Sequence, residues 1–419
     1  MAPKLPRAAF LLLGFVMNIM LGTAYAWSVF TQTLKDKFGA TSFTSMLPFA
    51  LALALFSIGM VFAGRLVDRR GPRQVAILGG LLLGAGYILS YFMDRTGYPM
   101  ETLTITYGII AGLGIGFTYS PPIAVAVRWY PVRKGLASGL VVMGFGLSAL
   151  ITAPLATWLI GAYGAPTTFL ILGVVFLAVV VVLGSFLAFP TGDWQPPTEV
   201  VSKAAQTRRT WKPVEEVPTR EMLRRPAFWV AWVLYTIGTA GGFMIIGNAK
   251  PIAQQVGGVT DAVLATAAVQ ILAVFNSAGR PIFGRAADVW TPKRALLVMY
   301  VILLGTMGLL SVSQGIGWVP LYVGICLTGM VFGGFLAVMP ALSTLFFGAK
   351  NQAANYGVLF TGYGLGAIVA LFASGFIRDA FGSYVPAFYA GMVLSLLGLV
   401  LTFAVRPPRP VPAGVPVVS

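Results

Sequence analysis

The sequence GRLVDRRGPR occupies residues 64–73, and its start returns as GRAAD at residues 284–288. A longer match follows at nearly the same spacing, because GLVVMGFGL at 139–147 returns as GVLFTGYGL at 357–365. The copies are separated by about 218–220 residues, roughly half of the chain. The chain therefore contains an internal duplication, and each copy is expected to form one half of the fold with its elements in the same order.

The residues around these repeats are apolar enough to need a membrane. Hydrophobic residues are 58% of the 419 positions and charged residues only 10%, whereas a soluble domain carries about 25% charge. A span needs roughly 20 mainly apolar residues to cross a hydrocarbon core about 30 Å thick. The sequence predicts an all-α membrane protein with twelve transmembrane helices in two six-helix bundles. The predicted spans are 8–31, 43–64, 75–93, 102–127, 136–160 and 167–189 within residues 1–190, and 227–249, 261–284, 295–313, 318–346, 356–377 and 385–405 within residues 226–406.

Composition also excludes several classes of protein. The chain has no histidine and a single cysteine, Cys326, which excludes disulfides, Cys/His metal sites and histidine proton relays; no cofactor is expected. The net charge of +16 does not indicate nucleic acid, because the basic residues occur in short runs between apolar stretches rather than on one folded domain. No cluster of acids or nucleophiles suggests an embedded enzyme.

The basic residues divide unequally between the two sides of the predicted topology. One side receives 22 of the 28 Lys and Arg residues and the other side five, with Arg280 left inside a span. Because cytoplasmic loops carry the excess of positive charge, both termini are predicted in the cytoplasm, and the protein in the inner (cytoplasmic) membrane. The segment 191–225, rich in Pro and charged residues, is predicted to be a cytoplasmic linker, and residues 407–419 a cytoplasmic tail.

Arg280 is the one Lys or Arg placed well within a predicted span. A charge inside the membrane indicates function by default, and a guanidinium can bind a carboxylate through two parallel hydrogen bonds. The alternative is snorkelling, since Arg280 lies four residues before Gly284 at the end of its span. Helical side chains tilt toward the helix N-terminus, however, which points Arg280 back toward the midplane. Its repeat partner is Met60, so the scaffold itself needs no cation here.

These residues resemble a known family. Residues 64–73 resemble the loop 2–3 signature of the major facilitator superfamily, and residues 284–288 resemble a decayed second copy. Within that superfamily the chain is similar to the monocarboxylate (lactate/pyruvate) transporters and the related oxalate/formate antiporters. Three stretches carry this resemblance: GTAYAW at 22–27, RWYPVRKGLASG at 128–139 and NSAGRPIFG at 276–284. The last stretch is similar to the segment that holds the substrate arginine of the family.

The chain departs from its relatives at charged positions. Asn276 stands where many proton-coupled monocarboxylate transporters keep an aspartate beside the arginine, and Tyr363 where the oxalate exchanger has a lysine. Ser28 lies in the region of a span-1 lysine of the animal relatives. No Asp or Glu lies deep in any predicted span. A single fixed cation matches a monoanion better than a dianion, and these departures put a proton relay carried by the protein in doubt.

Further candidate site residues follow from the resemblance and from helical spacing. Asn276 lies one turn from Arg280 on the same helix face, as a direct or indirect ligand. Tyr119 is the candidate donor to a carboxylate or a 2-hydroxyl, with helix packing as the alternative for it and for the other aromatic residues. The candidate substrate-binding residues are Arg280, Asn276, Tyr119, Phe335, Phe145, Tyr363 and Ser28. The residues predicted to lock helix ends, with topology alone as the alternative, are Asp68, Arg69, Arg73, Arg128, Arg133 and Lys134.

The repeats and the resemblance together imply alternating access, in which two halves rock about a site at their interface. The expected substrates are small monocarboxylate anions such as lactate or pyruvate, carried together with a proton across the lipid bilayer. Two alternatives stay open: an exchanger of carboxylate anions such as oxalate and formate, which needs no proton, and a transporter-like sensor that binds the acid without moving it.

Overall fold

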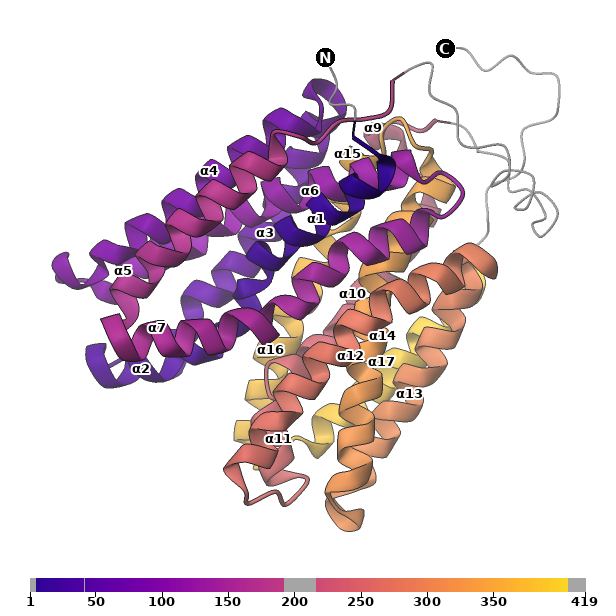
Figure 1. The fold of residues 1–419 in the computed structure, drawn as a ribbon. Helices are drawn as coiled ribbons and strands as arrows, with labels where there is room; N and C mark the ends of the chain where they lie inside the picture. The colour runs from indigo at the N-terminus through magenta and orange to yellow at the C-terminus, as the bar shows by residue number, and fades with distance from the viewer. Residues whose placement is uncertain (1–4, 41, 192–215, 406–419) are drawn as a thin grey trace.

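A computed structural model describes residues 5–40, 42–191 and 216–405, and each described secondary-structure element is a helix (Figure 1). The N-terminal bundle contains α1 (Arg7–Leu21), η1 (Gly22–Ala26), α2 (Ser28–Phe38), α3 (Ser42–Arg70), α4 (Pro72–Ser90), η2 (Tyr91–Arg95), α5 (Pro99–Leu103), η3 (Thr104–Ala111), α6 (Gly112–Trp129) and α7 (Lys134–Gly184). After the short α9 (Thr219–Met222), the C-terminal bundle contains α10 (Pro226–Ile246), α11 (Ala249–Gln255), α12 (Ala262–Val289), α13 (Pro292–Ile316), α14 (Trp318–Phe347), α15 (Gln352–Leu359), α16 (Thr361–Phe381) and α17 (Val385–Ala404).

These helices provide the twelve predicted spans. Ten described helical segments are long and apolar enough to cross a membrane. One of them, α7, consists of two helices, because Gly164 adopts φ 79° and ψ 165° between the fifth and sixth spans. The 28-residue α12, which carries Arg280, supplies a further span. Counting α7 twice and adding α12 gives twelve spans in the described part of the chain, so the predicted fold class is confirmed.

Both ends of the described chain lie at the same end of the bundles. We call this the motif end, because Asp68 and Asp288 of the repeated sequence lie there. The guanidinium of Arg7 stacks on the ring of Tyr130 in the α6–α7 loop, with 5.2 Å between Cζ and the ring centroid. At the other terminus Lys293 Nζ donates to the carbonyl of Val405 at 2.8 Å. An even number of spans requires this arrangement.

The bundles cross most closely through pairs of residues related by the duplication. Gly135 of α7 lies directly against the backbone of Gly284 in α12, leaving no room for a Cβ atom on either glycine. The same crossing recurs between Gly64 of α3 and the backbone of Ala353 in α15. Two further crossings repeat in the same way: Gly139 with Arg280 and Gly357 with Met60, and Gly146 with Ser277 and Gly364 with Ser57. The packing therefore has the pseudo-twofold symmetry that the sequence repeat predicts.

Two aspartates hold the bundles together at the motif end. Asp68, in the last turn of α3, accepts hydrogen bonds from the Ala354 N–H at the start of α15 and from Arg128 Nη2, both at 2.8 Å. Asp288, in the last turn of α12, accepts from the Gly135 and Leu136 N–H groups at the start of α7, at 3.0 and 2.8 Å. Each carboxylate thus accepts hydrogen bonds from N–H groups that have no partner within their own helix, at the start of a helix in the other bundle. Its negative charge also interacts favourably with the positive end of that helix dipole.

We call these contacts the two aspartate caps. The predicted spans end at residues 64 and 284, before both aspartates, but α3 and α12 continue through them. Of the residues predicted to lock helix ends, Asp68 and Arg128 form an ion pair, whereas Arg69 and Arg73 are exposed.

Most of the predicted linker, and all of the predicted tail, lie outside the described residues; the linker's last part is attached to the C-terminal bundle. Val217 is fully buried, and its N–H donates to the carbonyl of Phe347 at 3.0 Å. Asn355 Nδ2 of α15 donates to the carbonyl of Val217 at 2.9 Å, while the carboxylate of Glu216 accepts from the N–H of Lys350 at 2.7 Å. Residues 216–219 therefore form a strap that leads into α9 and α10.

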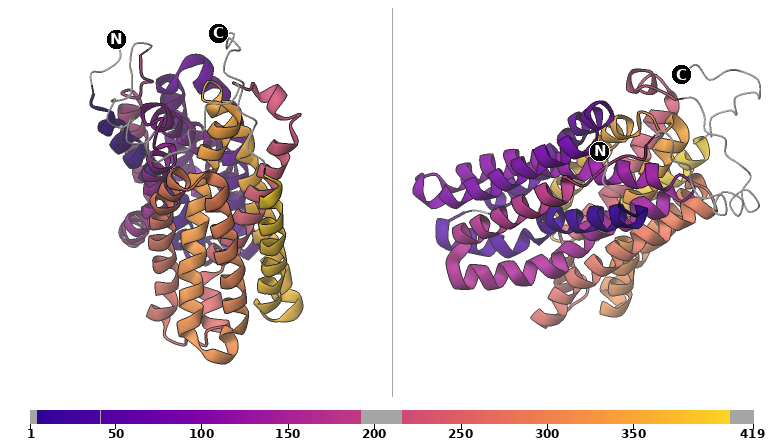
Figure 2. Two further views of the ribbon diagram at one scale, coloured as in Figure 1. Left: turned by 90° about the vertical axis from the view of Figure 1, so that its right-hand side faces the viewer. Right: turned by 45° about the horizontal axis from the view of Figure 1, so that its top comes forward.

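The bundles contact each other from the motif end to about the middle of the spans, and their ribbons diverge toward the opposite end (Figures 1 and 2). Within the described residues, the hydrogen bonds and close crossings between the bundles, from Asp288 with α7 to Tyr25 with Tyr363, lie within this half of the interface.

Candidate functional site

Arg280 is fully buried in α12, where that helix packs between α7 and α14. Its Nε and Nη2 donate to Oδ1 of Asn276, one turn earlier, at 3.3 and 3.2 Å. Its Nη1 donates to the backbone carbonyl of Val142 in α7. The guanidinium therefore lies between the bundles and does not extend to the motif end, as a snorkelling side chain would.

Neutral oxygen atoms alone hold this cation, since no described carboxylate forms a salt bridge with Arg280. A buried charge is costly when it has no counter-charge in a medium of low dielectric constant. Asn276 and the Val142 carbonyl satisfy some of the five N–H donors without removing the net charge. The site is therefore suited to an anion that enters from water and loses its own hydration beside the guanidinium.

Tyr25 and Tyr363 place two hydroxyl groups next to this cation. Tyr25 belongs to η1, the 3₁₀ turn that interrupts span 1, and its hydroxyl interacts with the Arg280 guanidinium. The hydroxyl oxygens of Tyr25 and Tyr363 are 3.0 Å apart, so they form a hydrogen bond between the bundles. Tyr363 lies in the first turn of α16, three residues after Phe360, which separates the end of α15 from the start of α16. Interrupted helices commonly position substrate-binding groups in transporters.

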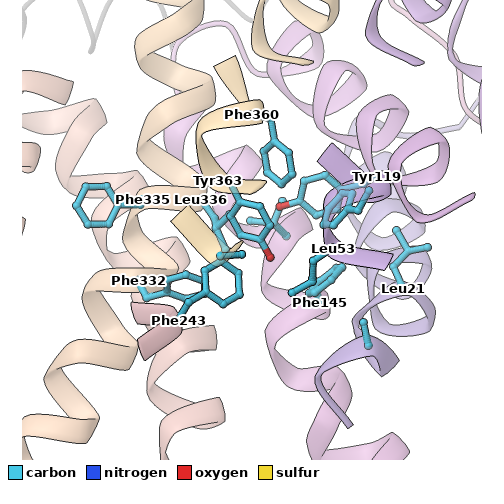
Figure 3. Packing of buried hydrophobic residues seen from close by; sticks show 14 of the residues in the cluster. Leu21, Leu53, Tyr119, Phe145, Phe243, Phe332, Phe335, Leu336, Phe360 and Tyr363 are labelled. Atoms are coloured by element: carbon cyan, nitrogen blue, oxygen red, sulfur yellow. The ribbon is translucent and has the colours of Figure 1, made fainter. Parts of the chain in front are cut away.

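Aromatic rings surround these polar groups (Figure 3). Phe145 lies edge-on to Tyr25 with ring centroids 5.0 Å apart, and its own centroid is 5.8 Å from Cζ of Arg280. Tyr119 lies edge-on to Phe145 at 5.6 Å, and Figure 3 shows its hydroxyl turned toward the space between the bundles. Phe360 stacks on Tyr363 at 4.5 Å and contacts Tyr119 at 5.6 Å. These rings form an apolar layer around Arg280. The layer offers few groups that could solvate a charge on a substrate anywhere except beside Arg280.

The structure brings five of the seven predicted site residues together, namely Arg280, Asn276, Tyr119, Phe145 and Tyr363. Phe335 lies elsewhere, because its ring packs on Tyr300 of α13 at 5.3 Å and fills the space beside Gly238 of α10. Figure 3 shows it pointing away from the interface. Phe335 is therefore a core residue of the C-terminal bundle in this structure. Ser28 is the first residue of α2, and its side chain lies outside the described part of the chain.

Sequence reasoning missed Tyr25 and the Val142 carbonyl. Tyr25 lies in the stretch GTAYAW, three residues after Gly22. Its place in a stretch that carries the family resemblance was the available signal. A 3₁₀ turn changes which side chains share a face, however, and the sequence does not announce that turn. The Val142 carbonyl carries no side-chain signal.

The fold and the site together define a class of protein: a carrier with two repeated bundles and, among the described residues, one buried cation between them. A comparison with family models matches residues 11–319 to the Major Facilitator Superfamily, and the chain belongs to this superfamily. Its members are transporters rather than enzymes.

Similar proteins agree with this assignment. The chain is 30% identical to the uncharacterized transporter YhjX of Escherichia coli (strain K12), over 84% of each chain. It is 26% identical to the oxalate:formate antiporter of Oxalobacter formigenes, over 94% of this chain and 92% of that one. It is 23% identical to human monocarboxylate transporter 10, over 90% and 74%. The resemblance inferred from sequence stretches is thus confirmed.

A solved structure shows the same fold. The outward conformation of the transporter FucP superimposes with a TM-score of 0.69, covering 95% of this chain and 99% of that chain at 15% identity. At this level of identity the likeness concerns the fold alone.

Proposed function

We propose that the protein transports small monocarboxylate anions, such as lactate and pyruvate, by alternating access. The observation that carries this proposal is the buried Arg280, held only by neutral oxygens at the interface of the bundles. A carboxylate can displace the Val142 carbonyl from the guanidinium and form two charge-assisted hydrogen bonds. The single cation and its aromatic surroundings favour a monoanion, because a second carboxylate would meet rings instead of a second positive charge.

The distribution of positive charge indicates the orientation of the protein in the membrane. The motif end carries Arg65, Arg69, Arg70 and Arg73, all exposed, and positively charged loops favour the cytoplasmic side. We therefore assign the motif end, with both termini, to the cytoplasmic side of the inner membrane. In this orientation the structure is closed toward the cytoplasm by the two aspartate caps and by the close crossings.

Coupling to protons is the second part of the proposal. Asn276 replaces the acid that could carry a proton beside Arg280, and described carboxylates such as Asp68 and Asp288 lie at the motif end. The bound anion alone compensates Arg280 and makes the loaded site neutral, which favours reorientation of the loaded carrier through an apolar interface. A coupled proton would therefore have to cross through water rather than on the anion, because a protonated acid would leave Arg280 uncompensated.

A second candidate function is carboxylate exchange without protons. Similarity to the oxalate:formate antiporter over nearly the whole chain favours it. The bond between Arg280 and the Val142 carbonyl favours it too, because it ties the bundles together when no anion is bound. A carrier that reorients only when loaded is an exchanger.

Uptake into proteoliposomes tests both functions. Purified protein would be reconstituted and supplied with labelled L-lactate or pyruvate, with and without an inward proton gradient and with an empty or acid-loaded interior. Accumulation driven by the gradient into empty vesicles supports proton symport. Uptake that ignores the gradient but needs internal acid supports exchange. Absence of uptake of any small monocarboxylate under both conditions contradicts the proposed function.

A further inference from the structure

The strap at residues 216–219 holds the turn between α14 and α15. The two oxygens of the Glu216 carboxylate accept hydrogen bonds from the N–H groups of Ala349 and Lys350, at 3.1 and 2.7 Å. Gly348, which starts this turn, has φ 86°, and a Cβ atom on it would overlap the Glu216 carboxylate. The carboxylate therefore fixes the backbone of the turn from the side of the linker.

The rest of the strap holds the first turn of α15. The side chain of Asn355 is fully buried there. Its Nδ2 donates to the carbonyl of Val217, and its Oδ1 accepts from the hydroxyl of Thr219, both at 2.9 Å. The strap thus binds both polar atoms of this side chain. The turn and the start of α15 are held as one unit.

This unit is what the N-terminal bundle contacts at the motif end. The N–H of Lys350 is bound to Glu216, and the carbonyl of the same residue accepts from Arg128 Nη2 of α6 at 3.1 Å. Four residues later, the N–H of Ala354 donates to Asp68 of α3. Each of these two hydrogen bonds between the bundles therefore ends on backbone that the strap positions.

The other aspartate cap is built differently. Asp288 accepts from the N–H groups of Gly135 and Leu136 at the start of α7. The repeat places Phe346 where Arg128 stands, 218 residues later. The hydrogen bonds of the described strap residues to the rest of the protein lead to α14, α15 and the turn between them. The strap thus serves the cap on α15.

We propose that Glu216 is a positioning residue for the closed state of the motif end, because it presents the Lys350 carbonyl to Arg128. The proposal rests on the alternating access of the proposed function, but not on its substrate. A turn that is already ordered loses little conformational entropy when the bundles close. Without Glu216 this loss opposes closing, and the open population at the motif end rises.

Thiol labelling of the full-length protein measures that population. In a Cys326→Ser background, Val67→Cys places the only thiol at a fully buried position of α3, in the same cluster of buried side chains as Ala353 of α15. A maleimide is applied without substrate, and the labelling rate follows the fraction of molecules that are open. We expect Glu216→Ala to raise this rate by about three- to tenfold, the value of one net hydrogen bond.

A matched control lies five residues further along the chain. Glu221 is also an acid of the segment that precedes α10, but it forms an ion pair with Arg225 of the same segment. Glu221→Ala should leave the labelling rate unchanged. If it raises the rate as much as Glu216→Ala does, the effect comes from surface charge and the inference is wrong.

Two second substitutions separate positioning from a general loss of stability. Arg128→Gln removes the side chain that the Lys350 carbonyl contacts, so Glu216→Ala should then raise the rate by less than about twofold. Asp288→Asn weakens the other cap, and in that background Glu216→Ala should keep its full three- to tenfold effect, about as in the parent protein. A purely structural role of Glu216 would give the same factor in both backgrounds.

The outcomes also separate this inference from the proposed function. If Glu216→Ala does not raise the rate, or raises it by the same factor in the Arg128→Gln and Asp288→Asn backgrounds, the inference is wrong, while uptake of lactate or pyruvate would leave the proposed function standing. Labelling needs no substrate. The expected pattern of rates in a protein that transports no small monocarboxylate would therefore support the inference although the proposed function fails.

Discussion

The motif end and the middle of the bundle interface differ in how far they keep the symmetry of the duplication. At the motif end Asp68 caps α15 and Asp288 caps α7, and the glycine crossings repeat with them. In the middle the symmetry of the side chains is lost, because Arg280 corresponds to Met60, and Arg280 is held by Asn276 and the Val142 carbonyl. Movement of two halves requires equivalent contacts on both sides, whereas recognition of one small anion requires a single, unequal site. The two regions therefore separate movement from recognition.

Removing the arginine breaks the unequal region and should have the largest effect. We expect Arg280→Gln to abolish uptake, and Arg280→Lys to reduce affinity by about ten- to a hundredfold, because charge-assisted hydrogen bonds are worth about 1.5–3 kcal/mol. Uptake of labelled lactate would be measured beside size-exclusion profiles that report folding. Arg285→Gln, which changes an exposed arginine of the same helix, is the control. Near-normal uptake by Arg280→Gln would contradict the assigned role of the arginine.

Placing an acid beside the arginine tests the same region with a smaller expected effect, because the arginine is kept. In Asn276→Asp the new carboxylate accepts the hydrogen bonds that Oδ1 now accepts, but it also neutralises the guanidinium when the site is empty. We expect anion binding at neutral pH to weaken by about tenfold or more. Acid should restore part of the affinity as the carboxylate becomes protonated. The ratio of variant to wild-type Kd, followed by intrinsic fluorescence from neutral to acidic pH, measures this; a constant ratio contradicts it.

The symmetric region is broken by neutralising its two aspartates. Asp68→Asn and Asp288→Asn each replace a carboxylate by a neutral amide, and so weaken the cap on a helix in the other bundle. We expect either change to favour opening at the motif end by about 1–2 kcal/mol, or roughly tenfold in population. Asp68→Asn should have the larger effect, because it also removes the ion pair with Arg128.

Thiol labelling can report this opening. In a Cys326→Ser background, Ser138→Cys places a probe at a fully buried position where α7 meets α14. Faster labelling in the Asp variants, with unchanged Kd for the substrate, confirms that the caps act on movement. A changed Kd without faster labelling would assign the aspartates to recognition and remove the distinction between the two regions.

Phe335 lies outside both regions, so its replacement should have the smallest effect on transport. We expect Phe335→Leu to lower the melting temperature in detergent, since core substitutions of this size cost about 1–2 kcal/mol, and to leave KM unchanged. Phe145→Leu, which alters a ring 5.8 Å from Arg280, is the comparison and should change KM. A change in substrate preference by Phe335→Leu would return this residue to the site.

The sequence predicted the spans and the arginine because both depend on properties that the chain carries locally. Long apolar segments need a bilayer, and a lone Arg280 within one of them is visible without a structure. Phe335 was placed wrongly because α14 is apolar on all sides, so no polar face shows which residues point inward. Tyr25 was missed because the 3₁₀ turn after Leu21 changes its direction. The caps that Asp68 and Asp288 provide go to α15 and α7 of the other bundle, and no local pattern contains such a contact.

The strap at residues 216–219 has a practical consequence for dividing the protein into two polypeptides. A cut placed by hydropathy would fall just before Pro226 and would leave Val217 and Glu216 on the first polypeptide. The bonds of these residues to Phe347, Lys350 and Asn355 show that they belong with the second. Co-expressed halves divided before Glu216 should therefore assemble into an active carrier more completely than halves divided at Pro226.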